Sequence, residues 1–142
     1  MATYVKYEEA IENLLNALID AFGTTNQWMA VIHTDAPTVA TDDELADLTQ
    51  IGGSNGYTTG GTDIQNDSTR TGGTVTITAV DVVWTASGGN LGASTTGRYF
   101  SIYDNTSTGD LLIASFDYGT TFTVADGETM TLDFGASLAT AA

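Results

Sequence analysis

The segment from Thr74 to Gly135 constrains the fold most strongly, because apolar and polar side chains alternate along it in short runs separated by glycine-rich turns. Alternation with a period of two is the pattern of β-strands that bury one face and expose the other. Several short strands of this kind, with turn signals between them, are typical of antiparallel sandwiches and jelly rolls. We therefore predict a mainly β chain that folds as an antiparallel β-sandwich or jelly-roll-like domain.

The end of this segment predicts a hairpin. From Phe122 to Phe134, apart from the turn in the middle, apolar residues occupy even positions and Thr or Asp occupy odd ones. A three-residue loop, Ala125–Gly127, keeps both apolar sets on one face, whereas a two-residue loop would separate them. Its final glycine also suits the left-handed position of a type I turn followed by a bulge. In this hairpin Phe122 faces Met130, and Glu128 is exposed at the mouth of the loop.

The alternation changes phase within the run Thr74–Trp84. The inward-facing set moves from odd positions, ending at Ala79, to even positions, beginning at Val80. A slip of one residue inside an otherwise continuous strand has two explanations. It indicates either a β-bulge at these two residues or a strand that crosses from one sheet to another.

Three further strands are predicted from short apolar runs bounded by turn residues: Arg98–Tyr103, Leu111–Tyr118 and Trp28–Thr34. The last run is almost entirely apolar, which indicates a buried strand. Pro37, the only proline, follows it and suits a strand terminator.

The stretches between these strands are less regular. Thr41–Leu48 predicts a single helical turn, with Thr41 as the N-cap and Glu44 three residues later as its capping-box partner. Residues 52–73 are rich in Gly, Thr, Ser, Asn and Asp, and predict a long loop with one edge strand at Tyr57–Asp63. Long loops of small β domains are common contact sites.

Residues 7–22 form the one predicted helix, because their apolar side chains recur at helical spacing while Glu, Asn and Asp fill the other side. The apolar stripe either packs on the sheets or, in part, faces a neighbouring subunit. If it faces a partner, we expect the contact residues to be Tyr7, Ile11, Leu14, Leu18 and Phe22, together with Tyr57 from the long loop.

No boundary divides the chain, so residues 1–142 are predicted to be one domain. Within it we expect the helix at 7–22, the β-sandwich at 28–135 and a short tail at 136–142.

The charge balance excludes some partners. The chain has 18 Asp and Glu against 3 Lys and Arg, a formal net charge of −15, so it cannot neutralise the phosphates of a nucleic acid. The acidity either keeps the protein soluble or suits a basic partner surface. The absence of cysteine excludes disulfides and thiolate metal sites, and no apolar run approaches the ~20 residues of a membrane span. Since the N-terminus lacks the basic region of a signal peptide, we expect no classical secretion.

No residue pattern indicates catalysis. His33 is the only histidine and lies in an apolar strand without a nucleophile motif nearby, so we interpret it as a structural or partly exposed residue and not a catalytic one. The carboxylates at Asp42–Glu44 and at Asp104 with Asp110 do not match the ligand spacing of a calcium loop. We predict a protein that is not an enzyme and has no cofactor or metal. The aromatic residues fit a core better than a sugar-binding platform: Trp28, Tyr57, Trp84, Tyr99, Tyr103 and Tyr118.

Over roughly residues 28 to 134 the chain resembles small virion proteins of tailed bacteriophages. The pieces that carry the resemblance occur in the order and spacing of that family: Ala30–Pro37, Ile51–Gly61, Trp84–Gly89, Arg98–Tyr99, Phe116–Gly119 and Ala125–Glu128.

The resemblance implies a non-enzymatic β-sandwich protein of the virion, a capsid decoration (cement) protein. Such a protein binds the major capsid protein on the outer head surface, as a homo-oligomer expected to be a trimer, after synthesis in the host cytoplasm. It stabilises the head and binds neither nucleic acid nor membrane. Two alternatives remain: a tail, neck or fibre component with the same fold, and a lectin-like module that binds glycans.

Overall fold

The protein is mainly β and its sheets are antiparallel, as the alternation predicts. The computed structural model describes residues 3–15, 19, 28–93 and 96–141. In chain order its elements are β1 (Thr3–Lys6), α1 (Ala10–Leu15), β2 (Trp28–His33), the 3₁₀ helix η1 (Leu45–Asp47), β3 (Thr62–Asp63), β4 (Asp67–Thr71), β5 (Thr74–Thr78), β6 (Val82–Thr85), β7 (Gly97–Asp104), β8 (Leu111–Phe122), β9 (Thr129–Leu132) and β10 (Ala139–Ala141).

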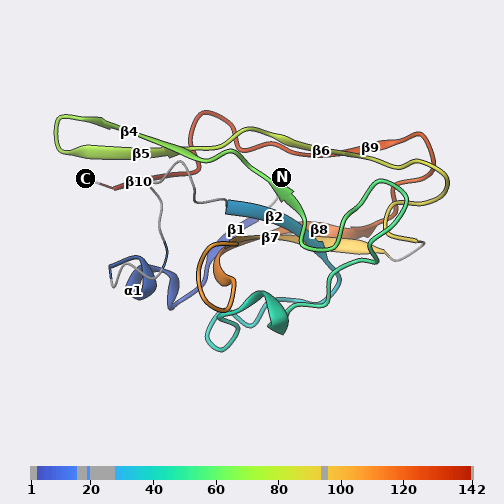
Figure 1. Cartoon of the computed structure of the whole chain (residues 1–142), viewed down its shortest axis with the longest axis horizontal. Coiled ribbons are helices and arrows are strands. Elements are labelled where there is room, and N and C mark those ends of the chain that lie inside the picture. The colour runs from blue at the N-terminus through green and yellow to red at the C-terminus, as the bar shows by residue number, and fades with distance from the viewer. Residues whose placement is uncertain (1–2, 16–18, 20–27, 94–95, 142) are drawn as a thin grey trace.

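The strands form three sheets arranged in two layers. One layer is a five-stranded sheet with the order β1-β8-β7-β2-β3. The other layer contains a three-stranded sheet, β10-β5-β4, and a two-stranded sheet, β6-β9, which lie one after the other along the length of the first layer (Figure 1). The β4–β5 hairpin reaches the far left end of the molecule in this view.

The main core lies between these two layers. Trp84 of β6 stacks on Phe100 of β7 with ring centroids 5.9 Å apart, and Phe100 stacks on Phe122 of β8 at 5.5 Å. Alternate residues of β2 and β7 complete the core, since Ile32 and Ile102 are fully buried in the same cluster. Period-two alternation in each strand therefore supplies one apolar face to a shared interior.

The five-stranded sheet is also covered on its other face. There Val31, Tyr103 and Leu112 pack with Leu48 of the loop that follows β2 and with Tyr7 of the segment before α1. Because both of its faces are buried, β2 is apolar at nearly every position, which explains why its sequence does not alternate.

The phase change after Ala79 marks a strand that crosses between sheets, which confirms one of the two explanations. β5 pairs with β4 and β10, whereas β6 pairs with β9. Val80 lies in the crossing and is 54% exposed. The side chain of Asp81 stabilises the crossing by accepting a hydrogen bond from the backbone N–H of Phe134 at 2.9 Å.

The prediction for the hairpin is confirmed for the face that points inward, but the predicted pairing of its two arms with each other is wrong. Phe122 ends β8 and lies opposite Gly97 of β7, whereas Met130 of β9 lies opposite Trp84 of β6. The turn between them is tight, because the N–H of Glu128 donates to the carbonyl of Ala125 at 2.9 Å. Its glycine is left-handed, as predicted, and Glu128 is exposed. Alternation reports which side chains face inward, and in this case the turn joins two layers.

The helix predicted at residues 7–22 begins later than expected. Tyr7 lies outside any helix, the next two residues form a turn, and α1 covers Ala10–Leu15. The remaining positions up to 22, apart from Ile19, lie outside the described residues. The helical turn predicted with Thr41 as its cap begins later, because Glu44 caps η1 and the carboxylate of Asp47 accepts the N–H of Glu44 at 3.2 Å.

The ends of the chain and the long loop contain strands that the sequence did not predict. The expected tail at 136–142 contains β10, which pairs with β5. β1 pairs with β8 at the edge of the five-stranded sheet. In the expected loop 52–73, the edge strand predicted at Tyr57–Asp63 is reduced to the two residues of β3. The same loop contains β4, which pairs with β5 across a two-residue Gly72–Gly73 turn. β4 and β10 are rich in Thr, Ser and Ala, and β1 and β3 are only four and two residues long, so the apolar signal of these strands is weak.

Candidate functional site

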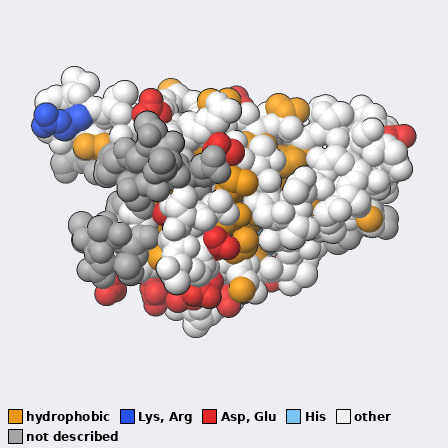
Figure 2. All heavy atoms as spheres, viewed as in Figure 1, with side chains coloured by type: hydrophobic (Ala, Val, Ile, Leu, Met, Phe, Trp, Pro, Cys, Tyr) orange, Lys and Arg blue, Asp and Glu red, His pale blue; other side chains and the backbone are white. Residues whose placement is uncertain are grey.

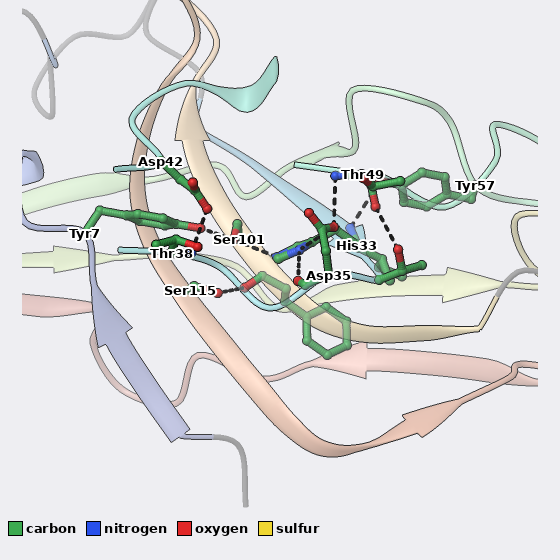
Figure 3. Close-up of polar contacts among 12 residues, drawn as sticks. Tyr7, His33, Asp35, Thr38, Asp42, Thr49, Tyr57, Ser101 and Ser115 are labelled. Atoms are coloured by element: carbon green, nitrogen blue, oxygen red, sulfur yellow. Dashed lines mark hydrogen bonds and ion pairs between the residues drawn. The ribbon is translucent and has the colours of Figure 1, made fainter. Parts of the chain in front are cut away.

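A buried chain of hydrogen bonds lies on the outer face of the five-stranded sheet, beneath the loop that follows β2 (Figure 3). His33 Nε2 lies 2.9 Å from the hydroxyl oxygen of Ser101 on the neighbouring strand β7. That oxygen lies 3.0 Å from the phenol oxygen of Tyr7, which precedes α1. The three side chains therefore connect two central strands to the N-terminal segment.

The acceptor on the other side of the imidazole sets the direction of these bonds. His33 Nδ1 lies 3.0 Å from the backbone carbonyl oxygen of Asp35, and a carbonyl can only accept, so Nδ1 carries the proton. In the neutral ring Nε2 then accepts from the Ser101 hydroxyl, which in turn accepts from Tyr7. The carboxylate of Asp35 lies further away, at 3.7 Å from Nδ1.

The order Asp35, His33, Ser101 matches the connectivity of a serine hydrolase triad, but the environment does not suit one. Both His33 and Ser101 are 0% exposed, so the hydroxyl oxygen cannot be reached by a substrate in this conformation. Burial also lowers the pKa of His33, against the opposing effect of Asp35. These side chains satisfy one another inside the fold, which supports the structural interpretation of His33.

The buried His33 predicts an acid-sensitive fold. Because its pKa is lowered in the folded state, the unfolded chain takes up a proton below its ordinary value of about 6.5 while the folded chain does not. The contribution of His33 to the free energy of unfolding should therefore be fully present above that pH. It should fall as the pH drops from 7 towards 5.5, with a slope of up to about 1.4 kcal/mol per pH unit. Urea unfolding at several pH values measures this slope.

The control is His33→Gln, for which the readout is the slope rather than the absolute stability. Gln has no titratable group, so the variant should show a nearly flat profile between pH 7 and 5.5. Equal slopes in the two proteins would contradict the assignment of His33 as the group that titrates.

A shallow surface pocket of about 250 Å³ lies above this network, lined by Val5, Pro37, Tyr99, Ser115 and Asp117 among others. Its polar groups are already paired. Arg98 donates two hydrogen bonds of 3.0 Å to Asp117 and lies 5.1 Å from the ring centroid of Tyr99. The guanidinium lowers the pKa of the Asp117 carboxyl. The Ser115 hydroxyl donates to the carbonyl of Phe100 at 3.2 Å, so the pocket offers no unpaired group for chemistry.

Acidic side chains gather along one edge of the molecule, below α1 and η1 (Figure 2). The N–H of Glu8 donates to the carbonyl of Val39 at 3.0 Å, which joins the start of α1 to the loop that carries η1. The pKa of Asp47 is lowered, because its carboxylate accepts hydrogen bonds from two backbone N–H groups. We use the term acidic edge for the carboxylates of the two segments that the Glu8–Val39 hydrogen bond joins, which are Glu8, Glu9, Glu12, Asp42, Asp43, Glu44 and Asp47.

The carboxylates do not form a metal centre in the part of the chain that the structure describes, where no group of three His, Cys, Asp or Glu could hold an ion. Asp104 is buried and accepts hydrogen bonds from the backbone N–H and the hydroxyl of Thr106, at 2.8 and 2.6 Å. It therefore orders the turn between β7 and β8. Burial and the proximity of Asp104 raise the pKa of Asp110 in the same turn.

The predicted contact residues are placed as follows. Tyr7 is 1% exposed and Tyr57 is 3% exposed, so both belong to the interior and not to a partner surface. The Tyr57 phenol accepts the N–H of Ile32 at 3.1 Å and donates to Gln50 at 3.0 Å, and burial raises its pKa to about 12. The side chains of Ile11 and Leu14, and the whole of Leu18 and Phe22, lie outside the described structure.

The sequence did not indicate that His33 bonds to Ser101 or that Ser101 bonds to Tyr7. Ser101 lies 68 residues from His33 in the sequence and 94 residues from Tyr7. The only available signal was parity, because Ser101 interrupts the apolar positions of β7. Among the six aromatic residues predicted for the core, five are buried, and Tyr118 is the exception at 44% exposed.

In the described part of the chain, no helix has the length and apolar character needed to cross a membrane. In comparisons with protein-family models, curated proteins and solved structures, nothing matches the chain.

Proposed function

We propose that the chain is a non-enzymatic structural protein of a tailed-phage virion, a β-sandwich that decorates the capsid exterior. The acidic edge carries this proposal. It presents carboxylates from two segments on one side of the molecule, and no Lys or Arg occurs between residues 7 and 69 to neutralise them. A surface of one sign complements a basic partner surface, so the capsid-facing side is the acidic edge.

The fold supports the same proposal. Two antiparallel layers that face each other across one apolar core suit a sandwich, and a jelly-roll connection is one way to thread its strands. The groups best placed for chemistry, His33 and Ser101, are sealed in the interior. A rigid body with a satisfied interior and a charged exterior suits a protein that acts by binding.

The physical mechanism is multivalency. We propose the major capsid protein as the partner and a homotrimer as the bound form. Each subunit then makes weak electrostatic contacts that are strong when repeated across the shell. A protein that bridges neighbouring capsid subunits favours the intact shell by mass action and raises the resistance of the head to heat and osmotic shock.

The test is rebinding to particles made by a phage that lacks the gene. The triple variant Glu8→Gln/Glu9→Gln/Glu12→Gln removes three exposed carboxylates of the acidic edge. We expect it to bind about tenfold more weakly than the natural protein at low salt, from about 0.5 kcal/mol for each lost contact. Binding of the natural protein should itself weaken as salt is raised.

The matched control removes the same charge from the opposite layer, as Asp67→Asn/Asp126→Asn/Asp133→Asn. In the native protein one side-chain oxygen of each of these residues accepts a backbone N–H at 2.7–2.8 Å, and Asn retains that oxygen. The control should bind as the natural protein does. Equal losses in both variants would show that only net charge matters, and no loss in either would refute docking through the acidic edge.

A further inference from the structure

An open groove lies at one end of the two layers, and the proposed function does not use it. It has a volume of about 560 Å³ and lies between the end of β8 and the beginning of β9. Its residues are contributed by the turn between these strands and by the strand ends themselves. They are Tyr118, Phe122, Thr123, Val124, Gly127, Glu128, Thr129 and Met130.

One wall of the groove is an exposed aromatic ring. Tyr118 has the same parity in β8 as Phe116 and Phe122, whose rings pack inward, yet it remains 44% exposed. Its ring packs edge-to-face on Phe122, with centroids 5.2 Å apart and planes at 71°. Phe122 in turn stacks on Phe100 in the core, so the Tyr118 ring packs on a side chain that is itself held by the core. The groove thus contains a rigid, flat, apolar surface open to solvent.

The groove is also lined by polar side chains that can accept hydrogen bonds. Thr123, Thr129 and Glu128 are all exposed there. One carboxylate oxygen of Glu128 accepts the N–H of Ala125 at 3.0 Å, which holds the exposed side chain in place. A ligand that fits must therefore have an apolar face for Tyr118 and hydroxyl groups for the threonines and the carboxylate.

We infer that this groove binds a neutral oligosaccharide. A pyranose ring has C–H faces that stack on an aromatic side chain and hydroxyl groups around its edge, which is the combination that the groove presents. The charges exclude acidic glycans, because none of the three cations of the chain, Lys6, Arg70 and Arg98, lines the groove, whereas Glu128 does. A phosphate, sulfate or sialic acid carboxylate would face an uncompensated carboxylate there. This inference does not depend on capsid binding.

The second exposed tyrosine shows what distinguishes this site. Tyr4 is 50% exposed and packs on Phe116 in a similar way, with centroids 5.5 Å apart and planes at 58°. It lines a different pocket, whose other walls include Trp28, Ile77 and Leu138 and are almost entirely apolar. An exposed tyrosine on an aromatic support thus occurs twice, but only Tyr118 faces hydroxyls and a carboxylate. Tyr4 is therefore the matched control.

The experiment uses the full-length protein on an array of neutral hexose and N-acetylhexosamine oligomers, with sialylated and sulfated glycans included, followed by calorimetry on the strongest neutral ligand. We expect binding to neutral glycans only. Tyr118→Ala should weaken binding at least about tenfold, and Glu128→Gln a few-fold, because the Gln carbonyl oxygen still accepts a hydrogen bond but without the strengthening effect of the charge. Tyr118→Phe should stay within about threefold, since the ring is retained, and Tyr4→Ala should bind as the natural protein does.

Several results would overturn the inference. They are a natural protein that binds no neutral glycan, a preference for the sialylated or sulfated ligands, and Tyr118→Ala binding that equals the natural level. Because Tyr118→Phe keeps the packing on Phe122, a loss in that variant as large as in Tyr118→Ala would also contradict stacking as the source of affinity. Competition by a lysine-rich peptide but not by sugar would identify the groove as a peptide site instead.

Discussion

Replacement of Trp84 by alanine is expected to lower the free energy of unfolding by about 3–5 kcal/mol, which is the usual cost of deleting a buried aromatic side chain. Trp84 is 2% exposed and stacks on Phe100 across the two layers, with the ring planes 20° apart. Its indole N–H also donates to the hydroxyl of Thr62 at 3.0 Å. The variant therefore loses both packing between the layers and a hydrogen bond.

The control is Val83→Ala in the same strand. Val83 is 56% exposed on the outer face of β6, so its truncation should change the free energy of unfolding by no more than about 0.5 kcal/mol. The unfolding of both variants in urea should be followed by circular dichroism. Tryptophan fluorescence is unsuitable for the comparison, because Trp84→Ala removes one of the two tryptophans of the chain. If the Trp84 variant lost less than about 1 kcal/mol, the β6–β9 sheet would not be packed on the five-stranded sheet as described.

Alternation predicted the inward faces because it is a local property of the chain. Ile77, Val82 and Leu132 each lie on the face that their parity assigns, and all three are buried. The crossing after Ala79 was also readable, since a slip of one residue moves every later side chain to the other face. In these segments sequence and fold agree except at Val80, which parity assigns to the inward face and which is 54% exposed in the crossing.

Strand pairing was not readable in the same way. Met130 can face either Phe122 or Trp84 without any change in the alternation of its own strand, and the structure pairs it with Trp84. The choice depends on contacts between residues far apart in sequence, which no local pattern contains. Short strands such as β1 and β10 are stabilised mainly by the sheet edge they join, so their own sequences carry little signal.

For the candidate sites, too, the sequence predicted local burial but not the contacts between distant strands. The apolar run predicted a buried strand, although His33 itself was interpreted as structural or partly exposed. Ser101 lies against His33 only because β2 pairs with β7, and Tyr7 reaches Ser101 through the path of the N-terminal segment. Tyr57 was predicted as a contact residue because it lies in a glycine-rich loop. It is buried instead, because its phenol bonds to the backbone of Ile32.

The groove at Tyr118 shows why an exposed site was missed. Its sequence pattern is that of a core strand, and parity alone assigns Tyr118 to the interior. Exposure results from the end of the opposite layer, since β9 begins only at Thr129 and leaves this part of β8 uncovered. A pattern within one strand contains no information about where the facing strand ends.

The particle-level prediction has the largest expected effect. If the protein decorates the head, particles should carry on the order of hundreds of copies, because multivalent binding occupies equivalent positions over the whole shell. Particles that lack the protein should release their DNA at a lower temperature and survive osmotic shock less well. Adding back the natural protein should restore both properties.

The most direct test is therefore the copy number and position of the protein in purified particles, by quantitative mass spectrometry and a low-resolution cryo-EM map. The proposal predicts on the order of hundreds of copies spread over the outer head surface, in contact with the major capsid protein through the acidic edge. A handful of copies at one vertex or along the tail would contradict capsid decoration and indicate a neck, tail or fibre component. Particles without the protein would refute the virion assignment altogether.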